Sequence, residues 1–257
     1  MYYLTIGSAT HPGCVKTENQ DSHNYVIPED SINKKKGILL TLADGMVGHS
    51  GGAVASKIAV EVLKDEYYRN EIRGSTIIKS LEKSFYIAHK EILTTAANNK
   101  DLKNMGTTLT AVVIKKNKLY FAHVGDSRGY LLSKKGFQQF TEDHSLPYDL
   151  YKLGRIKYED IENHPDSNVI TRALGMNEKL YVDCSVKPIK LKKHNYVLLC
   201  CDGLHKDVSN ENITEIIYKN NEPQLICDTL VETAMKNGGR DNITVIVGKI
   251  EKSKLFF

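Results

Sequence analysis

Leu39-Leu40-Thr41-Leu42-Ala43-Asp44-Gly45 is the stretch around which the rest of the chain is organised, a short apolar run that stops at a carboxylate followed by glycine. A run of this length, bounded by Gly37 and Gly45, fits a buried strand better than a helix, which ordinarily needs about ten residues or more. The strand is therefore predicted to end at Asp44. Gly45 has no side chain, so its backbone carbonyl can approach whatever the carboxylate holds.

The same arrangement recurs at three further places. One apolar run ends at Asp202-Gly203, an altered version ends at Gly125-Asp126, and Asp241 precedes the apolar run Ile243 to Val247. A single Asp-Gly after a strand is most often a turn. If the strands share a sheet system, however, the acids converge at one rim, where repulsion would raise their pKa values unless a cation lies among them. Oxygen ligands of this kind favour Mg²⁺ or Mn²⁺, allow Ca²⁺ and disfavour Zn²⁺.

The bulk properties are those of an ordinary globular protein. At 257 residues, with 41% hydrophobic and 26% charged side chains, the chain can bury a substantial core, and we expect a single domain over residues 1–257 because no linker is visible. The net charge of +4 is mild and dispersed, which argues against a nucleic-acid partner. No surplus amphipathic element remains, so we expect a monomer.

The cysteines and the hydropathy pattern predict a cytoplasmic protein. None of the five cysteines forms a Cys-x-x-Cys pair, and Cys200, Cys201 and Cys227 lie in apolar surroundings as reduced core residues do. The N-terminus lacks the pattern of a signal peptide, and no run approaches the ~18 apolar residues of a membrane span, so no membrane association is expected.

The periodicity of apolar residues predicts an α+β protein. Helices are expected after the glycine-rich segment 45–52, over about 78–92, and over about 223–235. A polar segment, 141–174, is expected to be a partly helical excursion. Strands are expected at 3–9, 23–27, 39–43, 107–114, 118–124, 129–132, 136–140, 180–186, 196–201 and 243–250. Short connections indicate antiparallel hairpins, and strands that are apolar on both faces indicate two sheets packed face to face, each covered by a helix pair.

Eight sequence blocks, in order through nearly the whole chain, resemble the bacterial form of the protein phosphatase 2C family (PPM, metal-dependent Ser/Thr protein phosphatases). They are Gly13-Cys14-Val15-Lys16-Thr17-Glu18-Asn19-Gln20-Asp21, Ala43-Asp44-Gly45-Met46 with Gly48-His49, Met105-Gly106-Thr107-Thr108, Val124-Gly125-Asp126-Ser127-Arg128, Asp143-His144-Ser145-Leu146, Asn168-Val169-Ile170-Thr171-Arg172-Ala173-Leu174-Gly175, Cys201-Asp202-Gly203-Leu204 and Gly238-Gly239-Arg240-Asp241-Asn242-Ile243-Thr244. The resemblance implies a four-layer α/β/β/α sandwich, in agreement with the layers argued above.

The resemblance also implies a metal site. Asp44, Asp202 and Asp241 would hold one ion, and Asp44 would bridge to a second ion that also takes the Gly45 carbonyl. Asp21, with Gln20, corresponds to the family's support of the second ion, partly through water. Asp126 together with Asp202 matches the position of a third, weaker ion. The implied cofactors are Mn²⁺ or Mg²⁺, two core ions and a possible third.

The implied reaction is hydrolysis of phosphoserine and phosphothreonine in proteins. Two ions lower the pKa of a bridging water, which attacks phosphorus in line, so the enzyme supplies no nucleophile. The substrates would be phosphoproteins made by a bacterial Ser/Thr kinase that this enzyme opposes. Segment 141–174 resembles the family's flap beside the metal site; alternatively, it is a surface insertion without functional consequence.

Several positions depart from the family pattern. Lys16 stands where an arginine commonly grips the substrate phosphate, Val47 replaces a glycine and Ala53 a common glutamate. Met46 occupies the place of a histidine suggested as general acid in eukaryotic relatives. For His49 and His144 we favour hydrogen-bonding roles over metal ligation.

The departures keep other functions open. A catalytically impaired pseudophosphatase that binds phosphoproteins as a regulator is one alternative, motivated by Lys16, Val47 and Ala53. A dinuclear hydrolase of small phosphate esters is another, because it would share the site but not the substrate.

Overall fold

A computed structural model describes residues 2–46, 51–69, 76–176 and 178–252, and most of their strands form two large sheets. The strands are β1 (Tyr2–His11), β2 (Ser22–Val26), β3 (Ile38–Ala43), β4 (Gly45–Met46), β5 (Gly106–Thr107), β6 (Leu109–Lys115), β7 (Lys118–Val124), β8 (Arg128–Ser133), β9 (Gly136–Gln139), β10 (Asp183–Cys184), β11 (Ile189–Lys190), β12 (Tyr196–Cys200) and β13 (Ile243–Lys252). One sheet has the order β1-β13-β12-β8-β9, and the other has the order β10-β7-β6-β3-β2, with β11 also paired to β7. All pairings within the described residues are antiparallel, as expected.

The central strands are buried on both faces because each sheet lies between two apolar layers. In β3, Leu40 and Leu42 pack with residues of the opposite sheet, whereas Leu39 and Ala43 pack against helices. This is the period-two alternation of a strand, with both faces apolar. The apolar run Leu39 to Ala43 is therefore a strand at the centre of the molecule.

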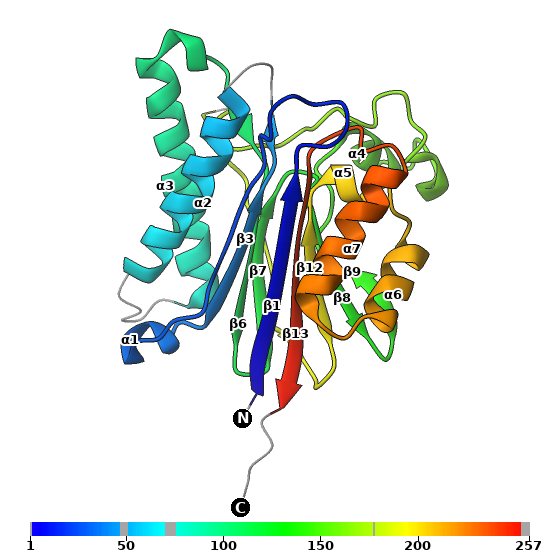
Figure 1. The fold of residues 1–257 in the computed structure, drawn as a ribbon. Helices are drawn as coiled ribbons and strands as arrows, with labels where there is room; N and C mark the ends of the chain where they lie inside the picture. The colour runs from blue at the N-terminus through cyan, green and yellow to red at the C-terminus, as the bar shows by residue number, and fades with distance from the viewer. Residues whose placement is uncertain (1, 47–50, 70–75, 177, 253–257) are drawn as a thin grey trace, which may run out of the picture.

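Helices cover the outer face of each sheet, which completes four layers (Figure 1). α2 (Gly51–Arg69) and α3 (Ile77–Asn98) lie over the sheet that contains β3, and α6 (Asn210–Lys219) and α7 (Pro223–Lys236) lie over the other. The shorter helices are α1 (Ser31–Lys34), α4 (Leu146–Lys152) and α5 (Asp202–His205), with 3₁₀ turns η1 (Lys100–Leu102) and η2 (Tyr158–Asp160). The prediction of an α+β sandwich with helix pairs outside two sheets is confirmed.

The sequence prediction differs from the structure in several elements: the short elements α1, α5, β4 and β11 were not predicted, and two further differences concern a longer strand and a longer helix. The predicted strand 180–186 is reduced to β10 on the edge of its sheet, because only Asp183 and Cys184 pair with β7. Leu180 and Val182 still pack against the core, whereas Tyr181 and Val186 are 56% and 97% exposed. Helix α6 was not predicted. Its signals are present: Ser209 caps the helix through the Asn212 amide, and Ile213 and Ile217 form its buried side.

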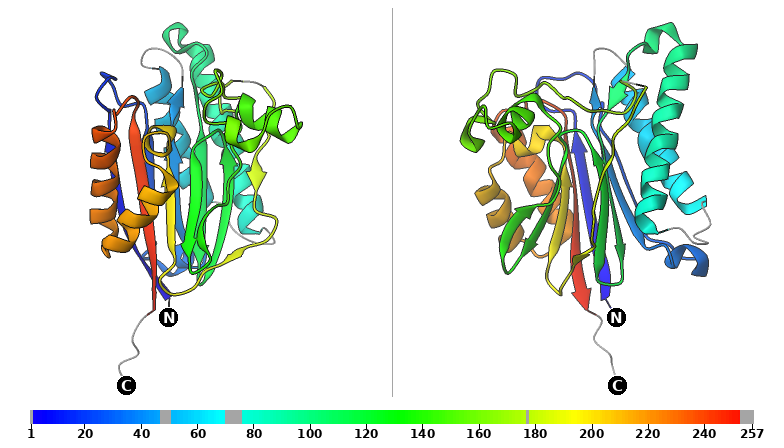
Figure 2. Two further views of the ribbon diagram at one scale, coloured as in Figure 1. Left: turned by 90° about the vertical axis from the view of Figure 1, so that its right-hand side faces the viewer. Right: turned by 180° about the vertical axis from the view of Figure 1, so that it is seen from behind.

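Segment 141–174 is partly helical, as predicted, because it contains α4 and η2. It is tied to the main body by bridges between Ser145 and Ile170 and between Thr107 and Leu174. Seen from the side and from behind, it lies at the same end of the sandwich as α5 (Figure 2). Cys200, Cys201 and Cys227 are buried free thiols, as expected. Among the described helices, none combines the length and apolar character needed to span a bilayer.

Candidate metal centre

Asp44 follows β3 directly, and its backbone is anchored on both sides by two threonines. The Asp44 amide donates to Thr108 Oγ1 at 2.8 Å, and the Asp44 carbonyl accepts from Thr107 Oγ1 at 2.8 Å and from the Thr108 amide at 2.9 Å. The motif Met105 to Thr108 therefore fixes where the strand delivers its carboxylate.

The glycines after Asp44 and Asp202 are required because backbone from elsewhere in the chain comes very close. A Cβ on Gly45 would lie 2.3 Å from the Gly52 carbonyl oxygen and 2.5 Å from that of Gln20. A Cβ on Gly203 would lie 2.1 Å from the Asn242 carbonyl oxygen. All three distances are far below van der Waals contact, so other segments of the backbone pack directly against the two glycines.

Asp21, on the turn before β2, points toward the strand of the opposite sheet that contains Thr244. Its Oδ2 accepts a hydrogen bond of 2.5 Å from Thr244 Oγ1, and its Oδ1 is buried without a hydrogen-bond partner in the described part of the chain. An unpaired buried carboxylate oxygen is costly, which makes it a natural cation ligand.

Asp241 lies at the start of β13, where Asn242 joins it to the N-terminal loop. Asp241 Oδ1 is 3.1 Å from Lys16 Nζ and accepts from the Asn242 amide at 2.8 Å. The Asn242 side chain donates to the carbonyls of Pro12 at 2.9 Å and Glu18 at 3.0 Å, and accepts from the Gln20 amide at 2.8 Å. This asparagine therefore holds the segment that carries both Lys16 and Asp21.

Asp126 follows β7 in a turn supported by His144. Nδ1 of His144 accepts from the Gly125 amide at 3.0 Å, and its Nε2 lies 3.1 Å from Asp183 Oδ2, so the expected hydrogen-bonding role of this histidine is confirmed. Asp126 is 4% exposed, and its Oδ1 also has no hydrogen-bond partner among the residues that the structure describes.

Three of the predicted carboxylates, Asp21, Asp44 and Asp126, have raised pKa values because they are buried and lie near other acids. Loss of solvent raises the pKa of Asp21 to about 7, helped by the charges of Asp202 and Asp241 and opposed by the hydrogen bond from Thr244. Loss of solvent, with Asp202 next, raises the pKa of Asp126 to about 7. The pKa of Asp44 is raised well above its usual range by the same loss of solvent and by the charges of Asp21, Asp202 and Asp126. Such a cluster is stabilised by protons or by cations.

Cys201 lies beside this cluster and was not predicted as part of it. Its Sγ and one carboxylate oxygen each from Asp21 and Asp44 all lie within 4.8 Å of one another. The thiol donates to the Asn242 carbonyl at 3.2 Å and accepts from the Thr244 amide at 3.0 Å. Burial and the neighbouring carboxylates raise the pKa of Cys201 well above its usual value, so it stays a neutral thiol rather than a nucleophile.

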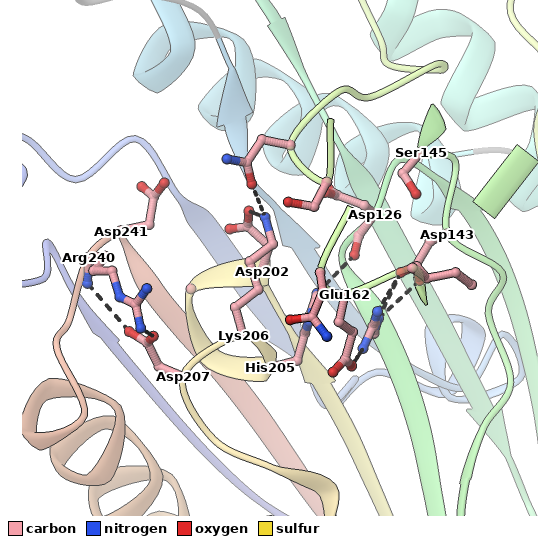
Figure 3. Close-up of a pocket in the computed structure, with 16 residues that line it drawn as sticks. Asp126, Asp143, Ser145, Glu162, Asp202, His205, Lys206, Asp207, Arg240 and Asp241 are labelled. Atoms are coloured by element: carbon pink, nitrogen blue, oxygen red, sulfur yellow. Dashed lines mark hydrogen bonds and ion pairs between the residues drawn. The ribbon is translucent and has the colours of Figure 1, made fainter. Parts of the chain in front are cut away.

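Two adjoining pockets give access to the carboxylates. One, here called the Asp44 pocket, is lined by Lys16, Gln20, Asp44, Gly45 and Met46 among others. The second, the Asp126 pocket of about 430 Å³, is drawn in Figure 3. Asn168, Asp202 and Asp241 line both pockets. Residues of segment 141–174 that line the Asp126 pocket are Asp143, Ser145, Ile161, Glu162, Asn163, Ser167 and Asn168.

The donor set fits hard divalent cations. The acids offer only oxygen, and two of them, Asp21 and Asp126, have buried oxygens without a hydrogen-bond partner among the described residues. Among the predicted residues, Val47 and His49 lie outside the described part of the chain, and Ala53 lies in α2. Thr107, Thr108, Thr244 and Asn242 were quoted only as parts of motifs; their positioning roles depend on contacts with residues far away in sequence.

Comparisons with known proteins agree with this geometry. The family model described as Protein phosphatase 2C matches residues 11–243. The serine/threonine phosphatase stp of Listeria innocua is 39% identical over 240 residues, covering 93% of this chain and 92% of that protein.

Solved structures give the same result. The serine/threonine phosphatase PstP/Ppp of Mycobacterium tuberculosis has a TM-score of 0.85 at 33% identity, covering 97% of this chain and 99% of that one. The catalytic domain of the serine threonine protein phosphatase PstP in complex with two manganese ions has a TM-score of 0.82 at 31% identity, covering 98% of this chain and 100% of that one.

Proposed function

The chain belongs to the protein phosphatase 2C family, and we propose that its acidic cluster holds the divalent ions with which it hydrolyses phosphoserine and phosphothreonine. The chain is a metal-dependent phosphoprotein phosphatase, and its substrates are phosphoproteins. The observation that supports the site is the convergence of Asp21, Asp44 and Asp126, whose pKa values are raised by burial and by neighbouring acids, with Asp202 and Asp241, whose charges contribute to those shifts.

We assign the ligands as follows. Asp44, Asp202 and Asp241 would hold one Mn²⁺ or Mg²⁺, and Asp44, the Gly45 carbonyl and Asp21 would serve a second. Such ions, when bound, lower the pKa of a shared water and neutralise phosphoryl oxygens. The unpaired oxygen of Asp21 and the lining of the Asp44 pocket by Asp44, Gly45, Asp202 and Asp241 support this assignment.

Lys16 is proposed to bind the substrate phosphate. It lines the Asp44 pocket and its side chain is 49% exposed, while its ammonium lies 3.1 Å from Asp241. An ion taken up by Asp241 would compete with this contact and leave the ammonium for the anionic substrate. Lysine offers a point charge rather than the fork of arginine.

The remaining assignments concern organisation and context. We propose one phosphatase domain over residues 1–257, with 141–174 as its flap, and a third, weaker ion near Asp126 and Asp202. We further propose a cytoplasmic monomer that opposes a bacterial Ser/Thr kinase. The lining of the Asp126 pocket by flap residues supports a role for the flap beside the metals.

The test is phosphate release from a phosphothreonine peptide with Mn²⁺, with Mg²⁺ and with chelator, using wild type and Asp202→Asn. We expect release that needs metal and falls at least about a hundredfold in the variant, because a charged metal ligand is lost. Asp228→Asn, an exposed carboxylate on α7, serves as the control and should match wild type.

The alternatives predict different results from the same experiment. The homology gives no support to a pseudophosphatase; folded, metal-loaded wild type that released no phosphate would nevertheless favour it. Faster turnover of a small ester such as p-nitrophenyl phosphate than of the peptide at equal concentration would favour the small-ester hydrolase.

A further inference from the structure

Lys206, just after α5, makes two contacts that join the acidic cluster to segment 141–174. Its Nζ lies 2.7 Å from Asp202 Oδ2 and donates a hydrogen bond of 2.7 Å to Asn168 Oδ1. Figure 3 shows the ammonium beside Asp202 within the Asp126 pocket. Neither contact was foreseen from the sequence.

The contact with Asp202 differs from an ordinary surface ion pair between residues four apart on a helix. In the pair of Lys219 with Glu215 on α6, both side chains are well exposed, at 69% and 59%. For Lys206 and Asp202 the values are 35% and 17%. Lys206 also has the second partner Asn168, which lies 38 residues away in sequence. The ammonium is therefore held in place by two separate segments.

The position of this ammonium bears on the weaker cation position proposed above. That position needs the carboxylates of Asp126 and Asp202 together. Both line the Asp126 pocket with Lys206, and the buried Oδ1 of Asp126 has no hydrogen-bond partner in the part of the chain that the structure describes. The positive charge of Lys206 also acts on Asp126. A divalent ion that binds at this position would need Asp126 and Asp202, and the Lys206 ammonium is already paired with Asp202.

On the basis of the proposed function, we propose that the Lys206 ammonium pairs with Asp202 at the position of the third ion, near Asp126 and Asp202. A third metal ion then binds there only by displacing this ammonium. Displacement also breaks the link to Asn168, so occupancy of the third position is coupled to release of the flap from Asp202. Lys206 is thus a positioning residue for Asp202 and for the flap.

The first test counts bound Mn²⁺ by electron paramagnetic resonance of the free ion. In Lys206→Met we expect the third ion to bind about tenfold more tightly than in wild type, with the affinities of the first two little changed. Lys206→Gln gives a second uncharged variant, Lys206→Arg should behave as wild type, and Lys219→Met is the matched control from an exposed pair.

Each alternative outcome has a distinct meaning. If wild type and both uncharged variants bind the third ion with equal affinity, the role proposed for Lys206 is wrong, whereas the proposed function still holds. Tighter binding of the first two ions alone would also overturn it, since Lys206 would then compete at the core. Wild type that bound no Mn²⁺ would contradict the proposed function, and the inference with it.

A second test separates the two contacts by amide hydrogen exchange in the metal-free protein. Lys206→Met and Asn168→Ala should both speed exchange around residues 167–169, because each removes the same link. Asn168→Ala should also tighten the third ion, but less than Lys206→Met does, because it removes only the part of the displacement cost that comes from the link to the flap. Unchanged exchange in both variants would contradict the coupling of the third position to the flap.

Discussion

Two lysines contact carboxylates of the acidic cluster, and their surroundings suggest different tasks. Lys16 contacts Asp241 from an open loop in the Asp44 pocket, whereas Lys206 is held between Asp202 and Asn168. The first can exchange its partner for a substrate phosphate, and the second cannot move without breaking contacts to two segments.

Replacing Lys16 tests its assignment as the phosphate ligand. In Lys16→Ala we expect KM for a phosphopeptide to rise about tenfold, because a charge-assisted hydrogen bond is lost, with a smaller change in kcat. Lys16→Arg should lower KM, because its fork matches the phosphate oxygens. Steady-state kinetics with saturating Mn²⁺ measures both. Lys135→Ala, on an exposed hairpin, is the control, and an unchanged KM in Lys16→Ala would rule the assignment out.

At the scale of elements, the site depends on loops that are tied to strand ends. Asn242 at the start of β13 makes three hydrogen bonds to the backbone of Pro12, Glu18 and Gln20. These bonds cross between segments that are far apart in sequence, so they order the loop that bears Lys16 and Asp21.

Removing this amide should cost both stability and metal binding. Asn242→Ala leaves three backbone groups without their partner. We expect a loss of about 2–4 kcal/mol in the free energy of unfolding, together with weaker Mn²⁺ binding. Denaturant melts and calorimetric Mn²⁺ titrations measure the two effects. Asn212→Ala, exposed on α6, should stay within about 0.5 kcal/mol of wild type, and equal losses in both variants would contradict the tethering role.

The acidic cluster predicts how the free energy of unfolding depends on pH when no metal is bound. The pKa values of Asp21 and Asp126 are about 7 in the folded protein, against about 3.9 in an unfolded chain. Between about pH 4 and pH 7 the folded state therefore holds more protons, so its stability falls as the pH rises through this window. We expect a loss on the order of 2–4 kcal/mol between pH 5 and pH 8 in chelator, which saturating Mn²⁺ abolishes.

A variant identifies the groups responsible for this pH dependence. Asp126→Asn should flatten the decline, because one buried carboxylate no longer has to ionise, whereas Asp228→Asn should keep it. Denaturant melts across the pH range measure the effect. Stability that rose from pH 5 to pH 8 in chelator would show that the carboxylates are not strained in the folded state.

At the scale of the molecule, the site lies across the interface between the two sheets. Asp44 follows β3 of one sheet, whereas Asp202 and Asp241 lie at the ends of β12 and β13 of the other. Between the sheets, Leu40 and Leu42 pack with residues of the opposite sheet. Ions bound by all three acids would therefore fasten one sheet to the other.

Metal should accordingly stabilise the whole molecule. At Mn²⁺ concentrations about a hundredfold above Kd, the added free energy is about 2.7 kcal/mol, which for a protein of this size raises Tm by roughly 5–10 °C. Calorimetry with and without Mn²⁺ measures the shift. Asp202→Asn should lose most of it and Asp228→Asn none; a full shift in Asp202→Asn would place the stabilising ion elsewhere.

The sequence by itself determined the family and the layered architecture, and it predicted the acids of the candidate site. It could do so because each depends on local patterns: apolar runs that end in Asp44 or Asp202, helical periodicity, and motifs in a set order. The strand predicted at 180–186 is too long, because only two of its residues pair with β7. Helix α6 was missed although its N-cap residue, Ser209, and its buried residue Ile213 are visible in the sequence.

Only the tertiary structure decided how these acids are held. The hydrogen bond from Thr244 to Asp21 joins residues 223 positions apart, and Lys206 reaches Asn168 across 38. No local pattern encodes such contacts, because they depend on how the two sheets and the flap pack. For the same reason the raised pKa values of the carboxylates, which require both burial and convergence, exist only in the folded molecule.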